Sequence, residues 1–150
     1  MSLLTFSLTG TSHSPTKFVA RARQFDIVID EPPTLGGDDE AANPVEYILA
    51  GYAGCLNVVG HLVARELGFE LRKLAIQIEG DIDPSRFLGH PTSQRAGYQG
   101  LRVQLQPDAD ASPALLETWL RLVEERCPVN DNLSQPTPVR VGLVLRRQAA

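Results

Sequence analysis

The sequence lacks the features that several classes of protein require. Its 14 Lys and Arg residues are outnumbered by 18 Asp and Glu, giving a net charge of −4, and they are spread along the chain. Phosphate binding needs clustered positive charge, so we expect no nucleic-acid partner. No apolar run reaches the roughly 18 uncharged residues of a transmembrane helix, so we expect no membrane span. The first residues lack the basic and apolar regions of a secretory signal, which predicts a cytoplasmic protein.

Cysteine is also scarce. Only Cys55 and Cys127 are present, far apart in the sequence. Because structural disulfides are rare in the cytoplasm, the two residues are either inert buried thiols or a transient redox pair. No histidine is spaced from either cysteine as a metal ligand would be, and no phosphate loop or dinucleotide fingerprint occurs. We therefore expect no metal and no cofactor.

The residues that are present predict one folded domain over residues 1–150. The length fits a single domain, and a hydrophobic content of 43% is ordinary for a soluble globular protein. Phe25, Ile27 and Ile29 alternate with more polar neighbours, which indicates a strand with one buried face. Residues 31–39, rich in Pro, Gly and Asp, predict a loop.

A long helix is predicted from Asn43 to about Leu67. Asn43 suits the N-cap, Pro44 suits the first helical position, and Glu46 completes a capping box. Gly68 suits the C-terminal end. The middle of this helix is apolar on nearly every side, and a soluble helix of that kind must be covered all round. In so short a chain, this predicts that a partner subunit covers part of it.

Further elements complete the pattern. Alternating apolar residues predict strands at residues 71–81, 97–106 and 139–145. An amphipathic helix is predicted to begin at Ser112 and to end at Pro128. Strands and helices in this order favour an α+β fold with an antiparallel sheet.

Cys55 is the first candidate for chemistry. It lies in the most apolar part of the long helix, where a buried, inert thiol is the simplest alternative. A cysteine attacks as thiolate, so a reactive Cys55 needs a nearby cation. Arg21 and Arg23 share the odd parity of the apolar strand positions, so a continuous strand would point both toward the buried face. If the strand begins only near Gln24, both arginines instead lie in solvent.

Three other residues have less direct roles. Glu46 lies on the opposite face of the helix from Cys55 and about 13 Å along its axis, so it cannot contact Cys55 of its own helix. It can contact an arginine, or a cysteine of another subunit. Cys127 lies at a helix C-terminus, which disfavours a thiolate, so it suits a resolving thiol or a helix-end core contact. His61 is about 240° around the helix from Cys55, which excludes a Cys–His dyad on this helix.

Four short motifs, in this order, resemble the OsmC-like family. They are Asp30-Glu31-Pro32 with Leu35-Gly36-Gly37, the helix start at residues 43–50, Ala53-Gly54-Cys55, and Cys127-Pro128-Val129. The resemblance covers roughly residues 18–145. It implies the fold of this family and an intertwined homodimer whose long central helices pack at the interface.

The resemblance also implies a chemistry. Cys55 would attack the peroxide oxygen of an organic hydroperoxide and become a sulfenic acid. Cys127 would then condense with it to a disulfide, which an external dithiol reduces. The role would be oxidative stress defence. On this hypothesis Arg23, or Arg21, activates the Cys55 thiolate, and Glu46 fixes the arginine.

Two other functions stay open. The best-studied peroxidase branch of the family has an acidic residue where this chain has Val45, and its activating arginine lies in a motif that this chain lacks. Both differences favour a non-catalytic module that binds a small apolar ligand or a protein partner, whereas the two cysteines favour the enzyme. A hydrolytic Cys–His enzyme is less favoured, because no histidine is placed to act as a base.

Overall fold

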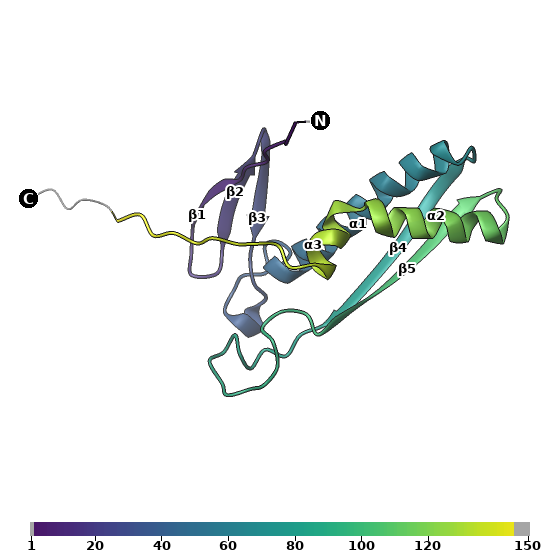
Figure 1. Ribbon diagram of the computed structural model, residues 1–150. Helices are drawn as coiled ribbons and strands as arrows, with labels where there is room; N and C mark the ends of the chain where they lie inside the picture. The colour runs from purple at the N-terminus through teal and green to yellow at the C-terminus, as the bar shows by residue number, and fades with distance from the viewer. Residues whose placement is uncertain (1, 146–150) are drawn as a thin grey trace, which may run out of the picture.

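The computed structural model describes residues 2–145, which form a small sheet and a larger body of helices on a β-ribbon (Figure 1). The sheet contains β1 (Thr9–Ser12), β2 (Phe18–Ala22) and β3 (Phe25–Ile29), paired in this order and antiparallel. In Figure 1 it stands to one side of the body. Antiparallel strands combined with helices confirm the predicted α+β class.

The turn between β2 and β3 decides where two candidate arginines lie. The chain reverses between Ala22 and Phe25, and Arg23 takes a positive φ of 56° in this turn. The prediction of a continuous strand that points Arg21 and Arg23 into a buried face is therefore wrong, and the alternative that leaves both in solvent is right. Arg21 lies beside Asp26, and the Arg23 guanidinium stacks over the Phe25 ring, 5.1 Å from its centroid.

α1 (Pro44–Glu66) begins as predicted. The Asn43 side chain accepts a hydrogen bond from the Glu46 backbone N–H at 2.9 Å, and the Glu46 carboxylate accepts one from the Asn43 N–H at 2.8 Å. These two bonds confirm the capping box, because they satisfy backbone donors that the helix leaves free. At the other end Gly68 has a φ of 81°, the left-handed conformation that stops a helix.

The ribbon pairs β4 (Leu71–Asp81) with β5 (Gly100–Ala109) in antiparallel register. β4 has the predicted bounds. Apolar residues alternate on both strands and lie opposite one another, as Ile76 does to Leu105. This apolar face packs on the core, and the polar face is exposed.

β5 begins later than the predicted Gly97, because residues 82–99 form a loop that returns to α1. The Tyr98 hydroxyl donates a hydrogen bond to the Val45 carbonyl at 2.9 Å. Tyr98 is thereby held at the N-terminal end of α1. The loop covers that end of the helix instead of extending the ribbon.

α2 (Pro113–Arg126) begins after its N-cap Ser112 and ends before Pro128, as predicted. Pro128 also begins a further short helix, α3 (Pro128–Ser134), which the sequence analysis does not predict. Proline ends a helix that precedes it and suits the first position of one that follows. Cys127 therefore lies at a corner between two helices.

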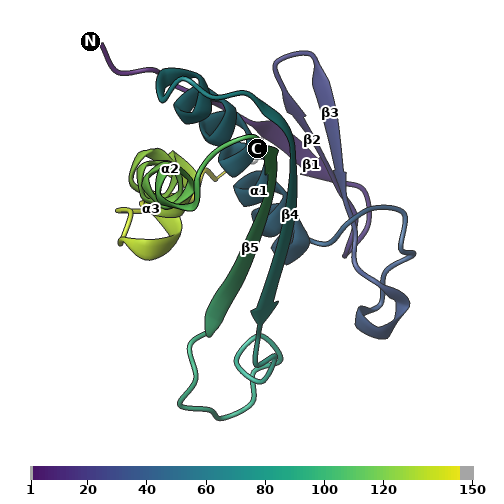
Figure 2. The ribbon, with the colours of Figure 1, turned by 90° about the vertical axis from the view of Figure 1, so that its right-hand side faces the viewer.

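The core lies where α1, α2 and β4 meet. Trp119 is 2% exposed, and its indole Nε1 donates a hydrogen bond to the Gly60 carbonyl at 2.8 Å. A side chain at position 60 would lie 3.1 Å from both the Trp119 ring and Leu74. Glycine at this position therefore allows the two helices to approach closely. Figure 2 shows α2 and α3 on one side of α1, with the ribbon crossing it.

One face of α1 is left uncovered within a single chain. Its buried residues share the face toward α2 and the ribbon: Tyr52, Leu56, Val59, Gly60, Val63 and Ala64. On the opposite side Val58 is 66% exposed. α1 is long and apolar enough to cross a membrane, whereas the sequence analysis expected no run of that length. The core helix of a globular fold meets the same criterion.

Two further segments lack a partner among residues 2–145. No helix or ribbon strand packs extensively on the sheet β1–β3. Residues 136–145 form neither helix nor strand, and their side chains are exposed. The predicted strand at residues 139–145 is thus wrong for the isolated chain. Alternation alone does not make a strand, because a strand needs a neighbour for its backbone hydrogen bonds.

Candidate functional site

The structure brings the two cysteines together. Cys55 lies in the middle of α1, and Cys127 lies at the corner between α2 and α3. Their Sγ atoms are 3.0 Å apart, with the Cys127 thiol donating to the Cys55 sulfur, and both are free thiols. The two sulfurs need only a small further approach to form a disulfide bond.

Cys127 is the more enclosed of the two thiols. It is 1% exposed, and it is the N-cap of α3, where its sulfur accepts the Asn130 backbone N–H at 3.4 Å. Burial first, and then the hydrogen bond to Cys55, raise the pKa of the Cys127 thiol. Cys127 is therefore protonated at neutral pH, which suits a donor to the Cys55 sulfur and a resolving role.

Cys55 is more accessible than Cys127. It is half-buried, whereas Cys127 is buried. Gly51, one helical turn earlier on the same side, has open space around its Cα: an added Cβ would meet no atom within 4 Å. The surface beside Cys55 is thus bare, and a molecule can approach its sulfur from there.

A hydrogen-bonded tyrosine holds the helix corner in place. The Tyr52 hydroxyl on α1 donates to the Asn130 Oδ1 on α3 at 2.6 Å. The Asn130 side-chain nitrogen in turn donates to the Glu124 carbonyl of α2 at 3.0 Å. Asn130 therefore ties three helices together beside the sulfur pair. Burial raises the pKa of Tyr52, as do the charge that Cys127 carries once it is ionised and the carboxylate of Glu124, so the hydroxyl keeps its proton at neutral pH.

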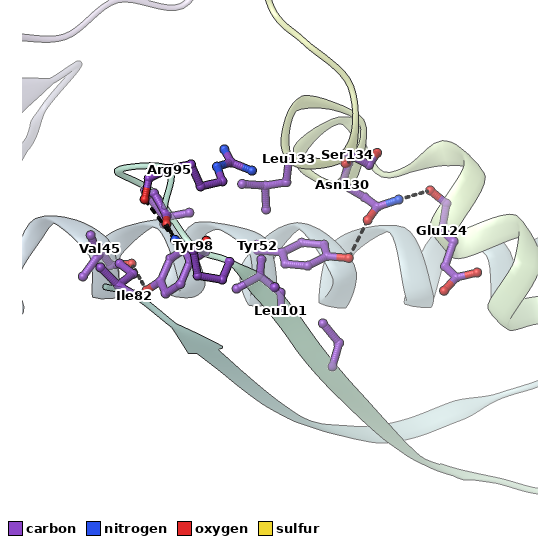
Figure 3. A pocket seen from close by; sticks show the side chains of 15 residues that line it. Val45, Tyr52, Ile82, Arg95, Tyr98, Leu101, Glu124, Asn130, Leu133 and Ser134 are labelled. Carbon is purple, nitrogen blue, oxygen red and sulfur yellow. Dashed lines mark hydrogen bonds between the residues drawn. The ribbon is translucent and has the colours of Figure 1, made fainter. Parts of the chain in front are cut away.

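A cavity of about 510 Å³ adjoins this corner (Figure 3). Tyr52 and Asn130 line one end of it, each one helical turn from a cysteine. Arg95 and Tyr98, from the loop between β4 and β5, line the other end. The floor between them is apolar: Val45, Ile48, Leu101, Val103 and Leu133.

The other predicted site residues lie away from the thiols of the same chain. Glu46 is engaged in the capping box of α1. Arg23 is in the β2–β3 turn on Phe25, and Arg21 is beside Asp26. Neither arginine therefore contacts Cys55 within one chain.

Tyr52, Asn130 and Arg95 were not singled out from the sequence. Tyr52 and Asn130 are 78 positions apart, and no periodic pattern reports such a pair. The signal that the sequence offers is the spacing of Tyr52, which lies about one helical turn before Cys55. Arg95 lies in a loop whose fold the sequence does not predict.

Metal and cofactor ligands are a separate matter. Within residues 2–145 no three His, Cys, Asp or Glu side chains lie close enough to hold one metal ion. The chemistry available at this site is that of the two thiols and of the polar groups around them.

The sequence model of the family described as OsmC-like protein matches residues 37–142. This range includes both cysteines, all of α1 and the whole body of the fold. The chain belongs to the OsmC-like family. No curated protein sequence matches it at a significant level.

Solved structures of the OsmC-like fold agree. An OsmC-like protein from Mycoplasma pneumoniae superimposes with a TM-score of 0.76 at 19% identity, covering 89% of each chain. An organic hydroperoxide resistance protein OsmC from Legionella pneumophila gives 0.63 at 20% identity, covering 89% of this chain and 91% of that one. An organic hydroperoxide resistance protein from Elizabethkingia anophelis gives 0.64 at 19% identity, covering 90% and 91%. At such identities the likeness shows the fold.

Proposed function

We propose that this protein is a thiol peroxidase that reduces organic hydroperoxides in oxidative stress defence. The observation that carries the proposal is the 3.0 Å separation of the Cys55 and Cys127 sulfurs, one accessible and one enclosed. Membership of the OsmC-like family supports it, as do the two similar structures named as organic hydroperoxide resistance proteins. The apolar residues around Cys55 favour an organic peroxide over hydrogen peroxide.

The proposed reaction has three steps. The Cys55 thiolate attacks the terminal peroxide oxygen, the O–O bond breaks, and the alcohol leaves with a proton while Cys55 becomes a sulfenic acid. The Cys127 thiol attacks this sulfenic acid, which forms a disulfide and releases water. An external dithiol then exchanges with the disulfide, is itself oxidised, and returns both cysteines to thiols.

Activation of Cys55 is assigned to two groups. The thiol of Cys127 donates a hydrogen bond to the Cys55 sulfur, an arrangement that suits an attacking sulfur carrying the negative charge. Because no arginine lies at Cys55 within one chain, we assign the cation to Arg23 of a second copy, with Glu46 as its partner. Arg23 sits at an exposed turn of the protruding sheet and has no carboxylate partner among the described residues, so it is free to take this role.

A homodimer is part of the proposal. The bare face of α1, the unpartnered sheet and the exposed apolar residues 139–145 are three surfaces that one chain leaves uncovered. Monomeric proteins rarely leave contiguous apolar patches of this kind exposed to water. A second copy covers all three surfaces at once. The two α1 helices pack on one another, and each sheet pairs with the terminal segment of the other chain.

We expect the wild-type protein to be dimeric by light scattering after size exclusion, and two changes to weaken the dimer. Replacing Val141 and Leu143 by lysine removes two apolar side chains from the terminal segment. The dissociation constant should rise by at least about tenfold. Arg140→Gln, in the same segment, is the matched control and should leave it unchanged. A wild-type monomer at all concentrations would rule out the dimer.

The peroxidase is tested by counting thiols by mass spectrometry before and after one equivalent of cumene hydroperoxide. We expect the wild type to lose two thiols promptly, with the disulfide mapped to Cys55 and Cys127. A dithiol should restore both thiols. The control is Cys55→Ser, which should keep its remaining thiol. If both wild-type thiols persist and react no faster than free cysteine, the protein is not a peroxidase.

A specific observation supports a second candidate, the non-catalytic module. A cavity of about 420 Å³ between α2 and β5 is lined mainly by apolar residues, including Leu56, Leu105, Leu116 and Trp119. A small apolar ligand would suit it. Persistence of both thiols, together with saturable binding of such a ligand, would favour this function.

A further inference from the structure

The two sulfurs differ in how a molecule from solution can reach them. The Cys127 side chain is 1% exposed and belongs to the core cluster that also contains Tyr52 and Val123. Cys55 is half-buried and lies beside the open surface at Gly51. In the proposed function the peroxide reaches the Cys55 sulfur through this surface, and a thiol can follow the same path.

Once the two cysteines form a disulfide, its reduction depends on access to one sulfur. A thiolate attacks one sulfur of a disulfide from the side opposite to the other sulfur, which leaves with the electron pair of the broken bond. Because the Cys127 side chain is buried, a path to its sulfur runs through packed protein. The path to the Cys55 sulfur begins at the surface of α1 instead.

The tie between Tyr52 and Asn130 keeps Cys127 covered. Asn130 donates its backbone N–H to the Cys127 sulfur at 3.4 Å, and its side chain accepts the Tyr52 hydroxyl at 2.6 Å. α3 has seven residues, and a helix this short is not stable on its own, so its position depends on its contacts. Leu133 and Ser134 of α3 border the cavity of about 510 Å³, which leaves room for α3 to move (Figure 3). The hydrogen bonds of Asn130 therefore oppose an opening of this corner.

The acidity of Cys127 acts against its departure as a leaving group, but more weakly than access acts. Burial raises the pKa of the Cys127 thiol, and a thiol of higher pKa leaves more slowly. The backbone N–H groups of Asn130 and Val129 lower this pKa and offset part of the effect. Exchange rates follow thiol acidity only as a fractional power, whereas a covered sulfur cannot react until α3 moves. Access therefore decides which sulfur is attacked.

We propose that the recycling dithiol attacks the Cys55 sulfur of the oxidised protein, and that Tyr52 and Asn130 are positioning residues that keep the Cys127 sulfur closed to it. A thiolate of the dithiol bonds to the Cys55 sulfur, the S–S bond breaks, and Cys127 leaves with the electron pair and takes up a proton. The second thiol of the reductant then attacks the sulfur bound to Cys55, which releases Cys55 and oxidises the reductant to its disulfide. The dithiol rests on the proposed function, while the choice of sulfur rests on the geometry.

The test uses protein oxidised with diamide, so that it requires no peroxide. The Cys55–Cys127 disulfide is treated with 2-mercaptoethanol, the exchange is stopped with acid, and the adduct is located by peptide mass spectrometry. A monothiol is chosen because it lacks the second thiol that would remove the adduct. We expect at least about tenfold more adduct on Cys55 than on Cys127 in the wild type. Equal amounts, or an excess on Cys127, would overturn the order of attack.

Two variants test the positioning residues. Tyr52→Phe deletes only the hydroxyl that holds Asn130, and Asn130→Ala deletes the side chain that ties α3 to its neighbours. Each should raise the ratio of Cys127 adduct to Cys55 adduct by about fivefold, as the loss of one hydrogen bond allows. Tyr47→Phe is the matched control, because Tyr47 also lies on α1 and donates to the Val28 carbonyl at 2.6 Å, and it should keep the wild-type ratio. An unchanged ratio in both Tyr52→Phe and Asn130→Ala would overturn their role.

The outcomes separate this inference from the proposed function. If peroxide leaves both thiols intact while the disulfide formed by diamide is opened at Cys55, the peroxidase falls and the order of attack stands. If peroxide forms the disulfide while the adduct lies mainly on Cys127, the peroxidase stands and the order of attack falls.

Discussion

Replacing Cys127 by serine, whose hydroxyl keeps a hydrogen-bond donor for the Cys55 sulfur, is expected to leave most of the rate of the first reaction with an organic hydroperoxide and to lower dithiol-dependent turnover by about 100-fold or more. The sulfurs of Cys55 and Cys127 are 3.0 Å apart and held by packed helices, so the disulfide forms between groups that are already in place. Intramolecular reactions of such geometry have effective concentrations far above those that an external thiol reaches. Without Cys127 the sulfenic acid must wait for a thiol from solution.

Intact-protein mass spectrometry distinguishes the steps in this variant. Cys127→Ser should gain the mass of one oxygen after one equivalent of peroxide, where the wild type loses two hydrogens. With excess peroxide, the trapped sulfenic acid should proceed to sulfinic acid, because no resolving thiol competes. Cys55→Ser is the control and should gain no oxygen under the same conditions. If Cys127→Ser turns over as fast as wild type, Cys127 is not the resolving thiol.

The parts of the fold that the sequence predicts are those with local signals. The start of α1 follows from Asn43, Pro44 and Glu46, whose side chains act within one turn of the backbone. β4 follows from alternation over residues 71–81, because that ribbon has one buried face. These signals depend on nearest neighbours in the chain, and so they survive without knowledge of the tertiary structure.

The misjudged parts depend on partners distant in the sequence or absent from the chain. β1, residues 9–12, is exposed and polar, so no alternation marks it. A hairpin turn separates Arg23 from β3, and parity arguments fail across a turn. Residues 139–145 alternate well, but alternation reports a potential face, and the neighbour that would make it a strand does not lie in the described chain.

The candidate site divides in the same way. The pairing of Cys55 and Cys127 was implied by resemblance to a family, and the 3.0 Å separation now gives it a geometry. A less reactive Cys127 was predicted from its place at a helix C-terminus, but the difference in burial between the two thiols was not, because the sequence analysis did not predict α3. The sulfur of Cys127 caps the N-terminus of that short helix and is buried, whereas the surface of α1 beside Cys55 is open. The tie between Tyr52 and Asn130, which fixes this corner, joins residues that no sequence pattern links.

Trp119→Ala is expected to lower the free energy of unfolding by about 3–5 kcal/mol. Trp119 is 2% exposed and fills the junction of α1, α2 and β4, so truncation leaves a large cavity. The change also leaves the Gly60 carbonyl without the indole donor. Urea denaturation at one fixed protein concentration measures the loss, since a dimer's stability depends on concentration.

Two matched variants separate the causes of this destabilisation. Trp119→Phe keeps most of the ring volume but not the N–H, and should lose less than Trp119→Ala, about 1–3 kcal/mol. Leu120→Ala changes the next residue of α2, which is 40% exposed, and should cost about 1 kcal/mol or less. A Trp119→Ala protein within about 1 kcal/mol of wild type would mean that this junction is not the core. Because α2 carries Cys127 at its end, the same variant should also slow formation of the Cys55–Cys127 disulfide.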